Sequence, residues 1–390
     1  MSNIVRIGII GVGTMGHAHA RHLYEKKTEN AVLTALCDTD SARREELSSL
    51  FPNIPVFEND DAFFAAGLCD AVIIATPHYA HPVIGMKAFD QGLHVLTEKP
   101  MAVQLSAAKA FAEASQKSGR VFSTMFNQRT DPLFQKAREL VKEGVIGAPK
   151  RFHWIITNWY RTQKYYDSGS WRATWCGEGG GVLMNQAPHN LDLWQWIFGM
   201  PKRIRAFCSE GKYHRIEVED EALIYAEYEN GATAVFQTMT GEYPGTNRLE
   251  ITGDGGKIVL ENGVLKLWRL QQSEREFCFE ATESFSKIPM EYEEFTFPRA
   301  RGAHGRIIQN FVDHILFNVP LLSHGEEAVN EVTLCNAAYL SSWKDCWVDL
   351  PMETDEFDAE LNKRILNSQK RSAASSSETV EYQERWQVRW

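Results

Sequence analysis

The stretch Val5-Arg6-Ile7-Gly8-Ile9-Ile10-Gly11-Val12-Gly13-Thr14-Met15-Gly16 decides the fold. Its first half is an apolar run of strand length, and its second half carries the spacing G-x-G-x-x-G at the start of a helical pattern. Glycines placed this way let backbone N–H groups approach a pyrophosphate at the positive end of a helix. Asp38 ends the next apolar run, 22 residues after Gly16, where a carboxylate accepts from a ribose 2′-hydroxyl. The pattern predicts a dinucleotide site formed by Gly11, Gly13, Thr14, Met15, Gly16 and Asp38.

Asp38 also indicates which dinucleotide binds. A carboxylate at this position repels the 2′-phosphate of NADP, so the sequence favours NAD as the cofactor. Arg43 and Arg44 follow closely and leave NADP open as the alternative.

The alternation of strands and helices continues from residue 5 to about residue 125. Near-continuous apolar strands separated by amphipathic helices are typical of a parallel sheet covered on both faces. We therefore expect an α/β Rossmann domain, a doubly wound parallel sheet, over residues 1–127. Its predicted strands are Val5–Ile10, Val32–Cys37, Ala71–Ala75, His94–Thr97 and Val121–Met125, and its clearest helices are Thr14–Glu25, Ala80–Gln91 and Leu105–Ser118.

The chain changes character after residue 150, and all eleven tryptophans lie between Trp154 and Trp390. Turn signals such as Glu229-Asn230-Gly231 separate short apolar segments and predict an antiparallel meander. A second α/β domain with an open, mainly antiparallel sheet is thus expected over residues 128–352, followed by a C-terminal helix and tail over residues 353–390. The predicted strands are Ala222–Glu229, Thr233–Thr240, Arg248–Thr252 and Lys257–Glu261, and two later helices, near Arg306–Phe317 and Glu326–Trp347, cover this sheet or return to the first domain.

Length and composition exclude several classes of protein. A chain of 390 residues with 44% hydrophobic and 24% charged residues is expected to fold, and its length suits two domains. Its net charge of −10 disfavours a nucleic-acid partner. The apolar runs, such as that from Ala71 to Ala75, are far too short to span a bilayer, and no leader pattern precedes the first strand. Seven cysteines without a C-x-x-C pair indicate free thiols. We expect a cytoplasmic protein with no membrane partner.

Two polar motifs follow predicted strands at the edge where α/β sheets collect ligands. Thr76-Pro77-His78-Tyr79-Ala80-His81 follows the third strand, where the structural alternative is a simple turn. Glu98-Lys99-Pro100 ends the next strand. A lysine there can donate a hydrogen bond to a substrate oxygen, and the proline helps to fix its direction.

A glycine-rich run from Gly179 to Gly181 leads into Val182-Leu183-Met184-Asn185-Gln186-Ala187-Pro188-His189-Asn190-Leu191-Asp192. If a helix begins near Gln186 or Pro188, Asn185, His189 and Asp192 share one face. Histidine suits the transfer of the proton that accompanies a hydride, whereas a lone helical histidine is otherwise structural. No zinc-binding spacing occurs, so we predict no metal.

Aromatic and basic residues alternate in Trp159-Tyr160-Arg161-Thr162-Gln163-Lys164-Tyr165-Tyr166 and again in Trp171-Arg172-Ala173-Thr174-Trp175. Aromatic faces with interleaved donors suit a sugar ring, whose faces are apolar and whose edges carry hydroxyl groups. Packing in a core or a subunit interface is the alternative.

These motifs together resemble the Gfo/Idh/MocA oxidoreductase family over roughly residues 4 to 352. The resemblance rests on the glycine turn, Thr76-Pro77, the run from Gly92 to Pro100 and His189-x-x-Asp192. It implies that Lys99 and His189 are catalytic, and that the exposed face of the second sheet forms a homodimer or homotetramer. By the same resemblance the substrate-binding residues are Tyr160, Arg161, Asn185 and Asp192, and further cofactor-binding residues are Thr76, Pro77, His81, Glu98, Asn127, Trp171 and Arg172.

The chain departs from the family pattern at Asn185, where aspartate is usual, and at Ala187, where glycine is usual. An asparagine can position a hydroxyl group but supplies no charge that favours the ammonium form of Lys99. The segment from Trp171 to His189 is similar to members that oxidise a ring hydroxyl of glycosides, often at C3. We expect an NAD-dependent dehydrogenase of a sugar, glycoside or cyclic polyol. The alternatives are a glycosidase that acts through transient oxidation, and a non-catalytic NAD-binding sugar sensor, against which the presence of both Lys99 and His189 argues.

Overall fold

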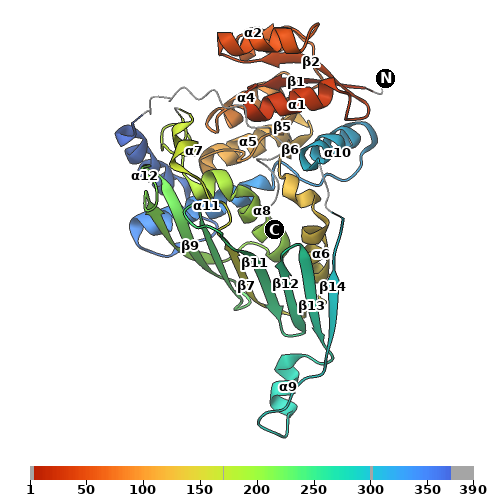
Figure 1. Ribbon diagram of the computed structural model, residues 1–390, viewed down its shortest axis with the longest axis vertical. Helices are drawn as coiled ribbons and strands as arrows, with labels where there is room; N and C mark the ends of the chain where they lie inside the picture. The colour runs from red at the N-terminus through yellow and green to blue at the C-terminus, as the bar shows by residue number, and fades with distance from the viewer. Residues whose placement is uncertain (1–3, 170, 299–301, 370–390) are drawn as a thin grey trace.

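The computed structural model describes residues 4–169, 171–298 and 302–369, and the end of the predicted C-terminal tail lies outside them. Two sheets organise the chain (Figure 1). The sheet at the top of the view contains β1 and β2 with α1, α4 and α5 packed around it, and the larger sheet extends below. Within the described ranges, no helix combines the length and apolar character needed to cross a membrane.

The first sheet has six parallel strands in the order β3-β2-β1-β4-β5-β6, which confirms the doubly wound prediction. Its strands form because continuous apolar runs are buried on both faces, as in Ala71–Ile74. The sequence did not predict β3, which has two residues, or the polar helix α2. The elements are β1 Val5–Ile10, α1 Thr14–Tyr24, β2 Ala31–Cys37, α2 Ser41–Leu50, β3 Val56–Phe57, α3 Asp60–Ala65, β4 Ala71–Ile74, α4 Ala80–Asp90, β5 His94–Thr97, α5 Leu105–Ser118 and β6 Phe122–Thr124.

The second sheet has nine strands in the order β14-β13-β12-β11-β7-β10-β9-β8-β15. Its strands alternate buried and exposed residues, as a sheet with one covered face requires. The prediction of a simple meander is wrong at one place, because β7 lies between β10 and β11 and pairs with β10 in parallel. The strands are β7 Pro149–Ile156, β8 Arg203–Glu210, β9 Glu219–Glu227, β10 Thr233–Met239, β11 Asn247–Gly253, β12 Gly256–Glu261, β13 Val264–Leu270, β14 Met290–Phe295 and β15 Val348–Asp349.

Two of the remaining helices, α10 and α11, pack against different sheets. α10 returns to the first domain, where Ile307, Ile308 and Phe311 share a buried cluster with Ile7 and Ile9 of β1. α11 instead packs on β8 and α8, and so covers the second sheet. The remaining helices and turns are η1 Asn127–Thr130, α6 Pro132–Lys142, α7 Gln163–Asp167, η2 Val182–Gln186, α8 Pro188–Phe198, α9 Glu274–Glu280, α10 Ala303–Phe317, α11 Ala328–Lys344 and α12 Thr354–Asn367.

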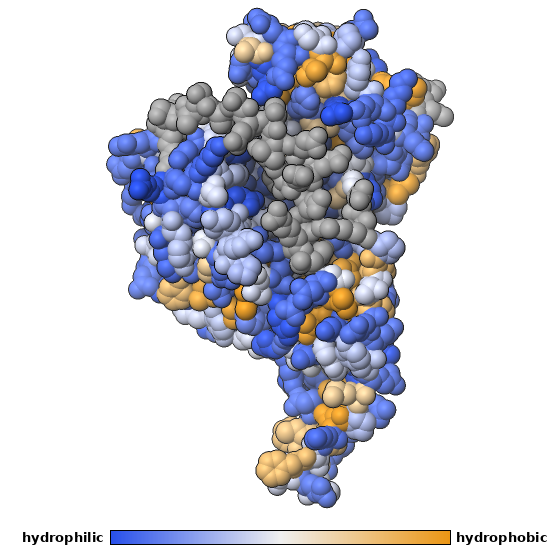
Figure 2. All heavy atoms as spheres, in the orientation of Figure 1, coloured by the Kyte–Doolittle hydropathy of each residue, from blue (hydrophilic) through white to orange (hydrophobic). Residues whose placement is uncertain are grey.

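An arm formed by β13, α9 and β14 projects from the edge of the second sheet, at the bottom of Figure 1. Figure 2 shows hydrophobic residues near its tip, where Phe279 is 85% and Phe285 is 95% exposed. The arm lies far along the molecule from the glycine turn, so it does not position the site described below.

Candidate active site

The glycine turn between β1 and α1 has the shape that the sequence predicts. Gly11 adopts a φ of +84°, in the left-handed region that favours glycine. A Cβ at Gly16 would lie 1.9 Å from the carbonyl oxygen of Gly11, so only glycine lets the helix approach the turn. No atom lies within 4 Å of a Cβ placed at Gly13, which precedes the first residue of α1. The helix N-terminus therefore faces open space with no side-chain cap, as a pyrophosphate site requires.

Asp38 lies at the end of β2 and is fixed by the same turn. Its Oδ2 accepts from the N–H of Val12 at 2.8 Å, and its Oδ1 accepts from the N–H of Asp40 at 3.0 Å. The two nearby arginines are engaged elsewhere, since Arg43 pairs with Glu46 and Arg44 donates to the carbonyl oxygens of Asp38 and Thr39. This arrangement fits the ribose of NAD better than the 2′-phosphate of NADP.

Four buried polar atoms, from the ends of β4 and β5, from η1 and from α8, have no hydrogen-bond partner within the described residues. They are Thr76 Oγ1, Thr97 Oγ1, Asn127 Oδ1 and His189 Nδ1. Buried polar atoms are normally paired, so this set indicates that a polar ligand completes the site. The residues present thus fit a dinucleotide at the carboxyl edge of the sheet.

His81 ties together two of the loops at this edge. Its Nε2 lies 2.7 Å from the carbonyl oxygen of Thr76, and its Nδ1 lies 2.8 Å from that of Pro100. The ring is buried, and so it holds the Thr76-Pro77 turn beside the Lys99-Pro100 bond, which is cis. The neighbouring His78 bonds through Nδ1 to the carbonyl oxygen of Glu178 at 2.9 Å and packs against Trp171.

Glu98 is buried beneath this edge and pairs with His19 of α1, whose Nε2 lies 2.8 Å from Oε1. Burial opposes ionisation, but the hydrogen bond and charge of His19 outweigh it and lower the pKa of Glu98 to about 2. Asn127 lies in the same layer and contacts His304 through Nδ2. Glu98 and Asn127, both predicted cofactor residues, therefore link the end of β5 to α1 and link η1 to α10.

Lys99 follows Glu98 and reaches across to the second domain. Its Nζ donates to the main-chain oxygen of Asn185 at 2.7 Å. Burial lowers the pKa of Lys99, whereas the negative charges of Glu98 and Glu178 oppose that change. The ammonium group is thus held at the boundary between the cofactor edge and the second domain.

The glycine-rich run and η2 lead directly into α8, the helix that carries His189. Glu219 of β9 accepts from the N–H groups of Gly181 and Leu183 at 2.9 and 2.8 Å, which fixes the chain ahead of α8. α8 begins at Pro188, so Asn185 lies in η2 rather than on the helix that carries His189. Burial, with the positive charge of Lys99, lowers the pKa of His189 well below its ordinary value. The neutral imidazole can accept a proton.

The carboxylate of Asp192 makes its hydrogen bonds with residues other than Lys99 and His189. Both of its carboxylate oxygens accept from Arg129, at 2.6 and 2.8 Å, and Oδ1 also accepts from Gln195. Its side chain is fully buried. The structure therefore places Asp192 in a buried ion pair and does not bring its carboxylate to Lys99.

The predicted aromatic and basic residues form a wall. Arg161 and Arg172 lie over the ring of Tyr165, at 5.0 and 4.8 Å from its centroid, and Arg172 donates to its hydroxyl oxygen at 2.9 Å. Tyr160 is 44% exposed and packs edge-on against Tyr243. Tyr160 is thus exposed, whereas the ring of Tyr165 lies under two guanidinium groups, and Arg172 also lies over the ring of Trp171.

The sequence did not predict three ionisable residues of this region. Glu178 is buried and contacts Asn185 and Arg172, although its place between Gly177 and Gly179 was a local signal. Arg129 and His304 gave no such signal, because they reach the site from η1 and α10. Among the described residues no group of three His, Cys, Asp or Glu side chains is placed to hold a metal ion.

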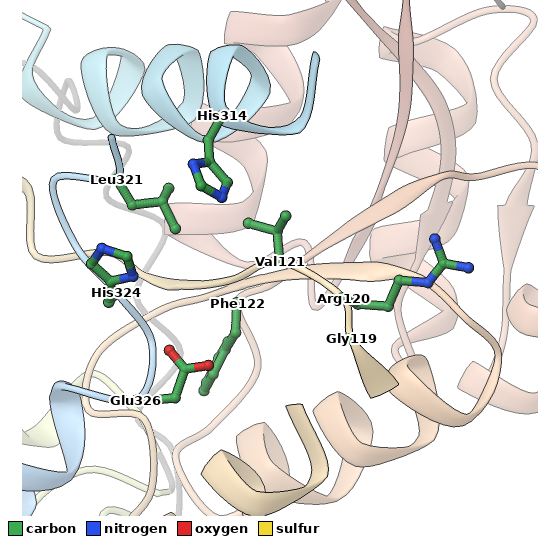
Figure 3. Close-up of a pocket in the computed structure, with 8 residues that line it drawn as sticks. All are labelled: Gly119, Arg120, Val121, Phe122, His314, Leu321, His324 and Glu326. Carbon is green, nitrogen blue, oxygen red and sulfur yellow. The ribbon is translucent and has the colours of Figure 1, made fainter. Parts of the chain in front are cut away.

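A separate cavity of about 220 Å³ lies near the amino end of β6 (Figure 3). Arg120, Val121 and Phe122 line it from one side, and His314 of α10 lines it from another. Because strands of this sheet are parallel, the amino end of β6 faces away from the edge that carries Lys99. The cavity is therefore not part of the candidate site.

The chain matches known sequence families in both domains. Residues 5–126 match the model of the oxidoreductase family with an NAD-binding Rossmann fold, and residues 134–259 match the GFO/IDH/MocA C-terminal domain. The scyllo-inositol 2-dehydrogenase (NAD(+)) of Bacillus subtilis is 26% identical over 267 residues, 67% of this chain and 75% of that protein. The myo-inositol 2-dehydrogenase of Thermotoga maritima is 23% identical over 342 residues, 86% of this chain and 95% of that protein.

Solved structures share the fold. The WlbA dehydrogenase from Bordetella pertussis, in complex with NADH and UDP-GlcNAcA, gives a TM-score of 0.74 at 24% identity, covering 90% of this chain and 100% of that one. Levoglucosan dehydrogenase in complex with NADH gives a TM-score of 0.74 at 20% identity, with the same coverage. The two sequence models together span more than half of the chain, and the glycine turn and the two sheets agree with them: the chain belongs to the Gfo/Idh/MocA family of NAD-binding oxidoreductases that act on CH–OH groups.

Proposed function

We propose that the protein is an NAD-dependent dehydrogenase that oxidises a ring hydroxyl of a sugar, glycoside or cyclic polyol. The observation that carries the proposal is the hydrogen bond from Lys99, which follows β5 at the carboxyl edge of the Rossmann sheet, to the main-chain oxygen of Asn185, four residues before His189. The positive charge of Lys99 contributes to the lowered pKa of His189, so the two groups act within one electrostatic environment. A cation and a neutral base together suit the oxidation of an alcohol.

The side chains divide the work as follows. The Nζ of Lys99, oriented by the carbonyl oxygen of Asn185, donates a hydrogen bond to the reacting oxygen and favours its negative charge. The neutral imidazole of His189 takes the hydroxyl proton. NAD, when bound, accepts the hydride from the carbinol carbon, so the alcohol loses a proton and a hydride and becomes a ketone. In the reverse reaction the same groups return the proton.

The aromatic wall supports a ring-shaped substrate. Tyr160 offers an exposed aromatic ring to the apolar face of a sugar ring, and Arg161 and Arg172, which lie over Tyr165, can donate hydrogen bonds to hydroxyl groups. The curated relatives named above are dehydrogenases of inositols, which are cyclic polyols. The narrower assignment, oxidation of glycosides at C3, rests on the resemblance of the segment from Trp171 to His189.

We also propose that the protein assembles as a homodimer or homotetramer in the cytoplasm, through the outer face of the second sheet. Exposed apolar side chains support this proposal, since Phe207 of β8 is 55% and Leu223 of β9 is 38% exposed. Light scattering of the purified protein tests it, and a monomer at micromolar concentration would contradict it.

A substrate panel tests the dehydrogenase assignment. Purified protein is mixed with NAD and, in turn, with inositols, monosaccharides, O-glycosides and C-glycosides, while the absorbance of NADH and the release of aglycone are followed. Formation of NADH with one class supports the proposal and names the substrate class. Release of aglycone without net NADH contradicts it in favour of a glycosidase, and binding of NAD without reduction across the panel contradicts it in favour of a sensor.

A further inference from the structure

Lys99 carries a buried positive charge that needs a negative partner. Three carboxyl groups face it: Glu98, Glu178 and Glu331. Glu98 is already paired with His19. Both carboxyl oxygens of Glu331 are buried without a hydrogen-bond partner in the described residues, an environment that favours the neutral acid. Glu178 is the group left to supply the charge.

The contacts of Glu178 favour the ionised form of its carboxylate. Its side chain is 3% exposed. Its Oε2 accepts from the N–H of Ala173 at 2.6 Å, and its Oε1 accepts from the Nδ2 of Asn185 and lies 3.9 Å from Arg172 Nη1. Burial is the largest influence and raises the pKa of Glu178, while Arg172 and the two donors oppose that rise and favour the carboxylate.

Asn185 connects this carboxylate to the lysine. Its side-chain amide donates to Glu178, while its main-chain oxygen accepts from Lys99. Asn185 therefore links the two charged groups, through its side chain on one side and its main chain on the other, and carries no charge itself. We propose that Glu178 is the positioning residue of the site, the counter-ion that holds Lys99 through Asn185 and keeps Arg172 against Tyr165. The expected effect of Glu178 on turnover rests on the proposed function, whereas its expected effect on the ionisation of Lys99 does not.

Other groups also face Lys99 and bear on its titration. Arg172 opposes its positive charge. The remaining neighbours are imidazoles whose burial lowers their pKa, which keeps them neutral near pH 7; they are His78 and His81 of the Thr76 turn, His189 of α8 and His304 of α10. Of the carboxyl groups, Glu98 has a pKa lowered to about 2 and is shared with His19, whereas Glu178 accepts hydrogen bonds from Ala173 and Asn185.

The test moves the carboxylate from one side chain to the other. Glu178→Gln removes the charge and leaves the shape. Asn185→Asp alone places two carboxylates in contact, and the double variant Asn185→Asp/Glu178→Gln restores one carboxylate and one amide with their order reversed. Glu331→Gln is the matched control, because it replaces a buried carboxyl group that faces Lys99 but is neutral.

Two readouts are needed. The pH dependence of trace acetylation of Lys99, followed by mass spectrometry of its peptide in the presence of NADH, reports the ionisation of Lys99 without turnover. The pH profile of kcat/KM reports the same ionisation during oxidation. We expect Glu178→Gln to move the Lys99 ionisation to lower pH by about one pH unit and to reduce kcat/KM about tenfold to a hundredfold.

The double variant decides between a charge effect and a packing effect. We expect it to return the Lys99 ionisation and kcat/KM to within about threefold of wild type, above both single variants, as expected for directly interacting side chains. Glu331→Gln should change neither.

A Lys99 titration in Glu178→Gln equal to that of wild type would overturn the inference, as would a double variant no better than Asn185→Asp. If wild type reduces no NAD, the proposed function fails, while the labelling of Lys99 still decides the role of Glu178.

Discussion

Asp192 and Arg129 form a buried bidentate ion pair. The Nη2 of Arg129 lies 2.6 Å from Oδ1 of Asp192, and its Nε lies 2.8 Å from Oδ2. Both side chains are at most 1% exposed. Burial alone would lower the pKa of Arg129, but Asp192 and then Glu327 raise it. The pair joins η1 to α8, and so it fixes the helix that carries His189.

Breaking this pair should destabilise the fold. Asp192→Asn leaves the guanidinium of Arg129 buried without its main counter-ion, and we expect the free energy of unfolding to fall by about 3–5 kcal/mol. Glu327→Gln is the control, because Glu327 binds the same arginine but is 43% exposed, and it should cost less than about 1 kcal/mol. Urea unfolding of both variants measures the difference. Equal losses would show that burial of the pair does not determine its strength.

Glu98 should make stability depend on acidic pH. Its pKa of about 2 in the folded protein lies below its ordinary value of 4.5. The folded state therefore favours the carboxylate, so this stabilisation is complete above about pH 4.5 and is lost as the pH falls toward 2. Glu98→Gln should lower the free energy of unfolding by about 3 kcal/mol at pH 7, and by much less near pH 3. A difference from wild type that stays constant across this range would contradict the pairing with His19.

The two glycines that flank Thr14 and Met15 should respond differently to alanine. Gly16→Ala brings a Cβ against the carbonyl oxygen of Gly11, and we expect a loss of about 1–3 kcal/mol in stability. Gly13→Ala meets nothing in the protein, so thermal unfolding should be unchanged while NADH affinity falls about tenfold, because the Cβ enters the space left for the pyrophosphate. Calorimetry and NADH fluorescence titration separate the two effects. Normal NADH binding by Gly13→Ala would argue against this placement of the dinucleotide.

Asp38 should set the preference for NAD. In Asp38→Asn the charge that repels a 2′-phosphate is removed, and with it the acceptor of the ribose hydroxyl. The dissociation constant for NADH should rise about tenfold while that for NADPH falls. Fluorescence titration with both reduced coenzymes measures the change, and a preference unaltered from wild type would place the ribose elsewhere.

Part of this architecture was predictable from sequence because its signals are local. The apolar strands and the spacing of Gly11, Gly13 and Gly16 predict the parallel sheet and its turn, and the structure confirms both. The position of β7 between β10 and β11 was not predictable, since strand pairing across about eighty residues leaves no mark in periodicity.

The residues of the candidate site likewise divide into those with a local sequence signal and those without one. Lys99 and His189 stand in short motifs that the sequence shows, and their catalytic roles stay predictions. The pairing of Asp192 depends on Arg129, sixty-three residues away in the chain, so the sequence could not predict that contact, and the predicted role of Asp192 in substrate binding stays a prediction. Glu178 was not predicted, although an acidic residue between two glycines is a local signal of a buried charge.

The histidine should be essential for turnover. His189→Ala removes the base, and we expect kcat to fall about a hundredfold or more while NADH binding is retained. His314→Ala, which changes a histidine of α10 in the separate cavity, is the matched control and should leave turnover unchanged. Steady-state oxidation with the substrate identified by the panel measures both. Unchanged turnover in His189→Ala would remove the histidine from the mechanism.

The most direct test of the account follows the hydride itself. A ring-deuterated substrate from the reactive class is incubated with NAD and the wild-type protein, and the coenzyme and the sugar product are analysed by mass spectrometry and NMR. We predict one deuterium on the nicotinamide ring for each ketone formed, with the label absent from solvent. Ketone formation with unlabelled NADH, or turnover of the substrate with no label in the coenzyme and no ketone, would contradict direct hydride transfer from the ring carbon.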